Sequence, residues 1–159
     1  MATPTRVIIL SLLGLSFATA CASPGPSSRA GASVRNRRMA VAHAAEAQVG
    51  VPYRYGGSSP RGFDCSGLVV YSYRKAGFEG LPHSATALDA VSQRISLREI
   101  EPGDLLFFRL DGPKTTHVGI YVGERQFVHA PSSGKRVEKV SFDHVYWGEK
   151  ISRAGRVAW

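Results

Sequence analysis

The second half of the sequence changes its apolar period, and this change restricts the fold more than any other feature. After Pro102-Gly103 the chain alternates short runs of β-branched and aromatic residues with turn-forming residues. These runs predict strands at 104–109, 117–123, 126–130, 136–142 and 153–157. Short strands that follow one another between turns are typical of an antiparallel sheet, and we expect about five to six strands in it.

Helical patterns precede the strands. Residues 38–50 are Ala-rich and end at a glycine, Asp64 can cap a helix over 65–76, and Ser84 can cap a third helix through about residue 91. Residues 50–63 are dense in Gly, Pro and Ser and are expected to form a loop. Helices segregated before strands indicate an α+β fold in which N-terminal helices pack on the sheet. With 159 residues the chain has room for one such domain.

The first twenty residues have the three parts of a secretory signal peptide. Arg6 precedes an apolar run over residues 7–18, and small residues follow in an A-x-A pattern at 18–20. The run is shorter than the roughly 20 residues that span a bilayer. Small residues directly before Cys21 resemble the bacterial lipoprotein signal, so we favour a lipid anchor on this cysteine. An ordinary cut that leaves Cys21 unlipidated stays open, and both alternatives export the chain.

Residues 22–38 are poor in large apolar side chains and rich in Pro, Gly and Ser. Such a segment predicts a coil, and we expect 21–38 to form a lipid-anchored flexible linker before a domain at 39–159. The chain has 20 Lys and Arg against 12 Asp and Glu, a net charge of +8. An excess of positive charge favours an anionic partner. Because export and the absence of a nucleic-acid motif argue against nucleic acid, we expect the acidic cell envelope to be that partner.

The first candidate for chemistry is Cys65, at the first turn of its predicted helix. Unpaired backbone N–H groups and the helix dipole favour an anion there, so we expect a lowered thiol pKa and a nucleophilic thiolate. With only two cysteines in the chain, a lipidated Cys21 leaves Cys65 without a disulfide partner. An inert buried thiol and a Cys21–Cys65 disulfide are the alternatives.

Two histidines on one predicted hairpin complete the candidate set. With the turn near Gly123-Glu124 and residue 118 opposite 128, His117 lies opposite His129, close enough for one ring to hydrogen-bond the other. His117 would then take the proton of the thiol, and His129 would orient the His117 ring. A Cys-His-His metal site is a competing use of these residues, but the pattern lacks a fourth ligand. We therefore expect no metal and no cofactor.

Several segments together resemble the NlpC-type peptidoglycan endopeptidases, a papain-like family. They are YRYGGSSPRGFDCSGLVVYSYRKAG, LPHSA, EPGDLLFF and HVGIYVGERQFVHAPSSGKRV, and the resemblance covers roughly residues 38–159. It implies a papain-like fold, a Cys-His-His catalytic set at Cys65, His117 and His129, and an oxyanion-binding tyrosine twelve residues before the cysteine, here Tyr53. It also implies a substrate in the stem peptide of peptidoglycan, cleaved between D-glutamate and a diamino acid.

The same resemblance suggests which residues border the substrate. Asp64 and Ser66 flank the nucleophile as in the family motif, and His83 and Ser84 belong to the LPHSA element. In the family an arginine commonly stands where this chain has His83, and a glutamine where it has Leu88. Because that segment borders the substrate groove of the family, the exact peptide preference does not follow from the resemblance.

The sequence thus favours an exported cysteine hydrolase of the bacterial cell envelope that acts on peptidoglycan stem peptides. A non-catalytic wall-binding lipoprotein is one alternative. A hydrolase or acyl transferase that acts on a lipid or another amide is a second, because it would use the same nucleophile.

Overall fold

The structure is a computed structural model that describes the backbone of residues 26–158 and the side chains of 31–158. The predicted signal peptide and Cys21 lie outside the described residues. The elements are α1 (Pro26–Glu46), β1 (Ser58–Ser59), β2 (Gly62–Phe63), α2 (Cys65–Lys75), α3 (Ala85–Val91), β3 (Gln93–Ile95), β4 (Leu105–Phe108), β5 (His117–Gly123), β6 (Gln126–His129), β7 (Glu138–Ser141), α4 (Val145–Lys150) and β8 (Ile151–Arg156). None of the helices within this part of the chain has the length and apolar character needed to cross a membrane.

Six strands form one antiparallel sheet in the order β3-β8-β4-β5-β6-β7. The α+β fold and the sheet of five to six strands are therefore confirmed. The sequence did not predict the three-residue edge strand β3 or the short helix α4. It also assigned residues 50–63 to loop, whereas β1 and β2 pair there as a small second sheet.

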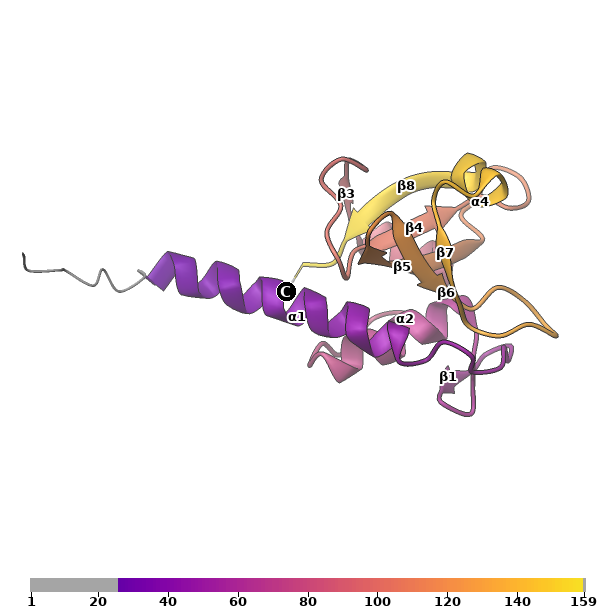
Figure 1. Ribbon diagram of the computed structural model, residues 1–159, viewed down its shortest axis with the longest axis horizontal. Coiled ribbons are helices and arrows are strands. Elements are labelled where there is room, and N and C mark those ends of the chain that lie inside the picture. Colours follow the sequence, from indigo (N-terminus) through magenta and orange to yellow (C-terminus); the bar gives the residue numbers. More distant parts are fainter. Residues whose placement is uncertain (1–25, 159) are drawn as a thin grey trace, which may run out of the picture.

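Each face of the large sheet carries its own apolar cluster. Helices α1 and α2 lie along one face (Figure 1), where Leu68 and Val69 of α2 pack against Val118 and Ile120 of β5. On the other face Phe108 and Phe127 pack with Trp147 of α4. Because side chains alternate between faces along a strand, neighbouring residues of β5 face different clusters. The sheet is therefore buried on both sides where the candidate residues lie.

The predicted coil over 22–38 is wrong from residue 26 onward. Helix α1 begins at Pro26, and its N-terminal half extends away from the rest of the domain (Figure 1). Proline is favoured at a first helical position, and the alanines and arginines that follow are good helix formers. The C-terminal half packs into the core through Val41 and Ala45, which are fully buried, so the helix continues from an anchored end. Its last helical residue is Glu46, followed by turns up to residue 50.

The predicted register of the β5–β6 hairpin is also wrong, by two residues. Ile120, not Val118, lies opposite Val128, and the two-residue turn consists of Glu124 and Arg125, both with positive φ. A shift of the pairing by two residues leaves each side chain on the same face of the sheet, so the prediction of which residues share a face is correct. Because of the shift, His117 and His129 are diagonal neighbours and do not lie directly opposite each other.

Candidate functional site

The thiol of Cys65 lies at the start of α2, as the sequence predicts. Asp64 caps this helix, accepting a hydrogen bond from the backbone N–H of Gly67 at 2.7 Å, and Cys65 carries a free thiol. A side chain at Gly67 is excluded, since a Cβ there would come within 2.0 Å of the carbonyl oxygen of Gly57. The loop before α2 is thereby packed directly against its first turn.

Burial raises the pKa of the Cys65 thiol to about 11, and the charge of Asp64 adds to this. Backbone N–H groups of Val118, Ser66 and Cys65 itself act in the opposite direction, because they stabilise a thiolate. The expectation of a lowered thiol pKa is therefore wrong for the resting site. The helix start supplies the expected donors, but the loss of solvent outweighs them.

The two histidines form a buried pair on the face of the sheet covered by α4. Nε2 of His117 lies 2.8 Å from Nδ1 of His129, which confirms the predicted hydrogen bond between the rings. Gly119 lies between them on β5, and a Cβ there would come within 2.7 Å of the Phe127 ring and 3.4 Å of the His129 Cβ. Because Gly119 has no side chain, the His129 ring has room to reach diagonally to the His117 ring.

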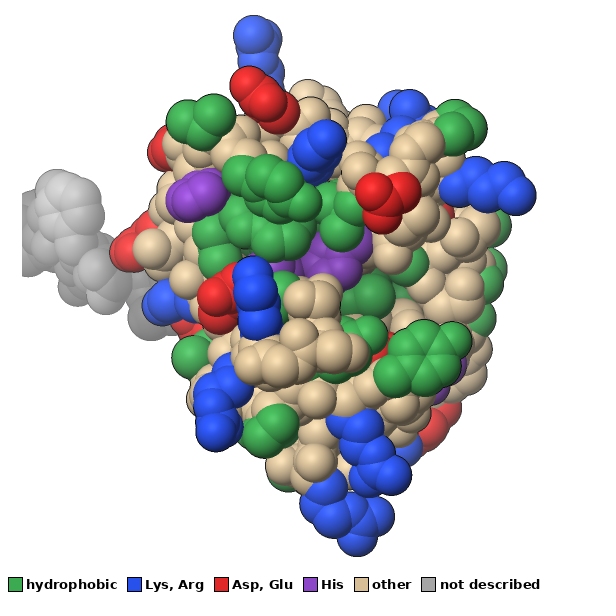
Figure 2. Space-filling view, turned by 90° about the vertical axis from the view of Figure 1, so that its right-hand side faces the viewer, with side chains coloured by type: hydrophobic (Ala, Val, Ile, Leu, Met, Phe, Trp, Pro, Cys, Tyr) green, Lys and Arg blue, Asp and Glu red, His purple; other side chains and the backbone are tan. Residues whose placement is uncertain are grey.

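Burial also sets the charge of the pair. It lowers the pKa of His117 to about 4, and the pKa of His129 to about 2 with a contribution from the neighbouring His117. Both rings are therefore uncharged near neutral pH. Trp147 of α4 covers them: its ring stacks on His117 at a centroid distance of 5.6 Å and meets His129 edge-on at 4.4 Å. Figure 2 shows histidine side chains among hydrophobic ones in the middle of one face.

A pocket of about 400 Å³ opens beside the thiol. It is lined by all the remaining candidates, namely Tyr53, Asp64, Ser66, His83 and Ser84, and also by Tyr55, Gly56, Ala85 and Thr116, which sequence reasoning missed. Burial, followed by the charges of Cys65 and Asp64, raises the pKa of Tyr53, so its hydroxyl keeps its proton. His83 Nε2 lies 2.9 Å from an Asp64 carboxylate oxygen, and Ser84 caps α3. The pocket wall is thus tied to the helix that carries the thiol.

One contact of the predicted Cys-His-His set, the one between Cys65 and His117, is not formed in the structure. Among the described residues no hydrogen bond joins Cys65 to His117, although Val118, the next residue of β5, directs its N–H toward the sulfur. Hydrogen bonds between catalytic groups are often long in the absence of substrate and tighten when it binds. Within residues 31–158, no three His, Cys, Asp or Glu side chains are grouped to hold a metal ion.

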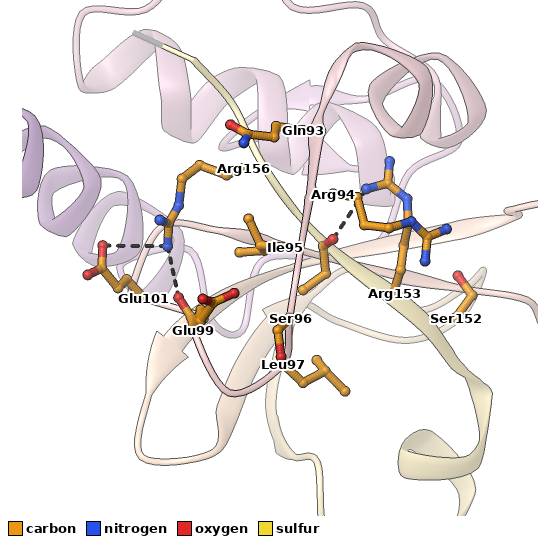
Figure 3. A pocket seen from close by; sticks show the side chains of 11 residues that line it. Gln93, Arg94, Ile95, Ser96, Leu97, Glu99, Glu101, Ser152, Arg153 and Arg156 are labelled. Carbon is orange, nitrogen blue, oxygen red and sulfur yellow. Dashed lines mark hydrogen bonds and ion pairs between the residues drawn. The ribbon is translucent and has the colours of Figure 1, made fainter.

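A second pocket, of about 830 Å³, lies at the β3 edge of the sheet, and β7 forms the opposite edge. Figure 3 shows Arg156 pointing toward the two acidic residues of this pocket: it donates a hydrogen bond to the backbone carbonyl of Glu99 and pairs with Glu101. None of the candidate residues lines it.

The helices packed on an antiparallel sheet, with a thiol at a helix start and a histidine pair on two adjacent strands, define the papain-like class of α+β proteins. The model of the NlpC/P60 family matches residues 50–156, and the chain belongs to this family. The resemblance seen in the sequence is thereby confirmed.

Proteins of known name and structure agree. The chain is 42% identical over 109 residues to the probable endopeptidase NlpC of Escherichia coli, covering 68% of this chain and 70% of that protein. It is 43% identical over 116 residues to the murein DD-endopeptidase MepH of Escherichia coli, covering 69% and 42%. The NlpC/p60 domain of the peptidoglycan hydrolase SagA superposes with a TM-score of 0.64 at 31% identity, covering 76% of this chain and 98% of that one.

The match is confined to a part of most relatives. Mycobacterial proteins named probable endopeptidases are 45% identical over 106 residues, and the chain spans 26% of their length. A lipoprotein-like NLP/P60 protein of Staphylococcus aureus superposes with a TM-score of 0.67 at 34% identity, and 42% of that chain is covered. The shared unit is therefore the domain itself.

Proposed function

We propose that this chain is a cysteine peptidase that hydrolyses an amide bond in the stem peptide of peptidoglycan. The observation that carries the proposal is the 2.8 Å bond between the two buried histidines, His117 on β5 and His129 on β6, since Val118, the residue after His117, directs its N–H toward the Cys65 sulfur. A free thiol at a helix start, an adjacent imidazole and a third group that orients it are the parts of a thiol hydrolase. The names of relatives, among them MepH and SagA, support peptidoglycan as the substrate.

In the proposed reaction His117 takes the proton of Cys65 as the sulfur attacks the carbonyl carbon of the scissile amide. The oxyanion that forms accepts hydrogen bonds from the Cys65 backbone N–H and the Tyr53 hydroxyl, which is protonated because its pKa is raised. Collapse breaks the C–N bond as His117 gives its proton to the leaving amine. Water, deprotonated by His117, then hydrolyses the thioester and restores the thiol.

The pocket beside the thiol supplies the substrate contacts. Asp64, Ser66, His83 and Ser84 line it, and they offer both acceptors and donors to a peptide. The bond we favour joins D-glutamate to the diamino acid. The names of two Bacillus subtilis relatives, the bifunctional muramidase/DL-endopeptidase CwlT and a gamma-DL-glutamyl hydrolase, support this bond, whereas the name of MepH indicates a DD bond.

Mass spectrometry of defined muropeptides after incubation with the purified chain tests the proposal, with Cys65→Ala as the matched inactive variant. We expect one stem-peptide bond to be cut by the wild type and none by the variant. Retained cleavage by Cys65→Ala would refute the nucleophile. Tight muropeptide binding without cleavage would favour a wall-binding protein, and cleavage of defined lipids alone would favour a lipid hydrolase.

Export and anchoring are part of the same proposal. Residues 1–20 would direct secretion, and Cys21 would carry the lipid that holds the domain at the membrane, facing the wall. Mass analysis of the mature N-terminus in a bacterial host tests this, with Cys21→Ala as the control. We expect diacylglyceryl on the wild type only, and an unmodified Cys21 at the N-terminus would refute the anchor.

A further inference from the structure

A carboxylate meets the histidine pair at the end away from the thiol. Glu138 is the first residue of β7 and lies directly opposite His129 in the β6–β7 register. Its Oε1 is 3.2 Å from Nε2 of His129, whose side chain is fully buried, while the Glu138 side chain is 45% exposed. Nothing in the proposed reaction uses this contact.

The contact determines where the protons of the pair lie. A carboxylate accepts hydrogen bonds and has none to donate, so the proton of the neutral His129 ring is on Nε2. Nδ1 of His129 is then an acceptor, and Nε2 of His117 must be the donor in the 2.8 Å bond between the rings. The one nitrogen left without a proton is Nδ1 of His117, which is the nitrogen free to act as a base.

We infer that Glu138 is a positioning residue that fixes the tautomers of both histidines and so keeps His117 ready to accept a proton from Cys65. This inference rests on the proposed function, since it explains how the proposed base is prepared. Glu138 does not line the pocket beside the thiol, so it acts through His129 and not through the substrate.

Without the Glu138 carboxylate, the positions of the protons on the two rings are no longer fixed. If Nε2 of His129 carries no proton, its Nδ1 does, and the bond between the rings then requires the proton of His117 to be on Nδ1. A proton on that atom prevents it from taking the one on the thiol. Groups that orient a metal-bound histidine from behind contribute about tenfold to hundredfold in activity, and we expect an effect of this order for a histidine base. Because Glu138 is half-exposed, water replaces it in part, and we expect a fall of about tenfold.

Two variants separate the acceptor from the shape of the side chain. Glu138→Gln keeps a carbonyl acceptor of nearly the same size, and Glu138→Met keeps the length but has no oxygen. The matched control is Glu124→Met in the exposed turn between β5 and β6, which removes the same charge from the same sheet without touching either histidine. We expect kcat to fall about tenfold in Glu138→Met, less in Glu138→Gln and not at all in the control, with KM unchanged throughout.

Nitrogen-15 NMR of the histidine rings supplies a readout that a merely structural role would not move. We expect a single Nε2–H form for both rings in the wild type and a mixture of tautomers in Glu138→Met. An unchanged tautomer in Glu138→Met overturns the inference even if kcat falls, and so does an unchanged kcat with a changed tautomer. If the wild type cleaves no stem peptide, the proposed function fails, whereas the NMR measurement still decides the tautomers.

Discussion

Replacement of Asp64 separates the stability of the α2 start from the reactivity of the thiol that it carries. Four groups contact the Asp64 carboxylate: the Gly67 N–H at 2.7 Å, the Gly56 N–H at 2.9 Å, Nε2 of His83 at 2.9 Å and the Ser66 hydroxyl at 3.0 Å. Loss of a helix N-cap costs about 1 kcal/mol, and each further hydrogen bond contributes about 0.5–1.5 kcal/mol. For Asp64→Ala we therefore expect the free energy of unfolding to fall by about 3–5 kcal/mol.

The matched variant is Asp64→Asn, because an asparagine caps a helix about as well as an aspartate. It keeps an oxygen for the Gly67 N–H but replaces the acceptor of the Gly56 N–H by an amide group, so we expect its stability to fall by about 1–2 kcal/mol, less than that of Asp64→Ala. Both variants remove the negative charge that raises the pKa of Cys65, so the thiol pKa should fall in both. The two variants should thus share the fall in thiol pKa but differ in the loss of stability.

Urea unfolding measures the first quantity, and the pH dependence of iodoacetamide alkylation measures the second. Ser84→Ala is a useful comparison, since Ser84 caps α3 through a longer contact of 3.5 Å and should cost only about 0.5 kcal/mol. The reasoning is refuted if Asp64→Asn is as unstable as Asp64→Ala. It is also refuted if the thiol pKa rises in either variant.

Three further outcomes follow from burial and packing. The pKa values of His117 and His129 are lowered, so the stability that depends on the uncharged rings is present above about pH 6.5 and is lost as the pH falls toward 4. The slope is at most about 1.4 kcal/mol per pH unit for each ring. Urea unfolding between pH 7 and 4 should show this loss, and His117→Asn should reduce the slope. Alkylation of Cys65 should accelerate about tenfold per pH unit up to about pH 11, and a plateau below pH 8 would contradict the raised pKa. Gly119→Ala should cost about 1–3 kcal/mol and slow cleavage, because its Cβ would overlap an aromatic ring 2.7 Å away; a melting temperature equal to that of the wild type would contradict this.

Local signals were sufficient to predict much of the fold and of the candidate site. The caps at Asp64 and Ser84 are as expected, because capping depends on residues within one turn. The histidines share a face because alternation along a strand is insensitive to a shift of two residues. Tyr53 was expected from the family resemblance and not from a local signal, and it lines the same pocket as the thiol.

Features that depend on the tertiary structure were not predictable in this way. The thiol pKa depends on how completely other elements cover Cys65, which the helix start alone does not reveal. Hairpin register depends on the turn, where Glu124 and Arg125 adopt positive φ although neither is a residue that favours it. Glu138 becomes visible only when β7 is paired with β6, and alternation over 136–142 gives one face of that strand but not its register.

Burial acts in opposite directions on the two groups that exchange a proton in the proposed reaction. It raises the pKa of Cys65 and lowers that of His117, so both are uncharged near neutral pH. Passing the proton from sulfur to nitrogen creates two opposite charges together, and their attraction makes this transfer less costly than the two separate ionisations. The N–H groups of Ser66 and Val118 already face the sulfur and stabilise it only once it is charged. A site with this arrangement holds a protonated thiol until the step that needs a thiolate, and the donors for that thiolate are in place beforehand.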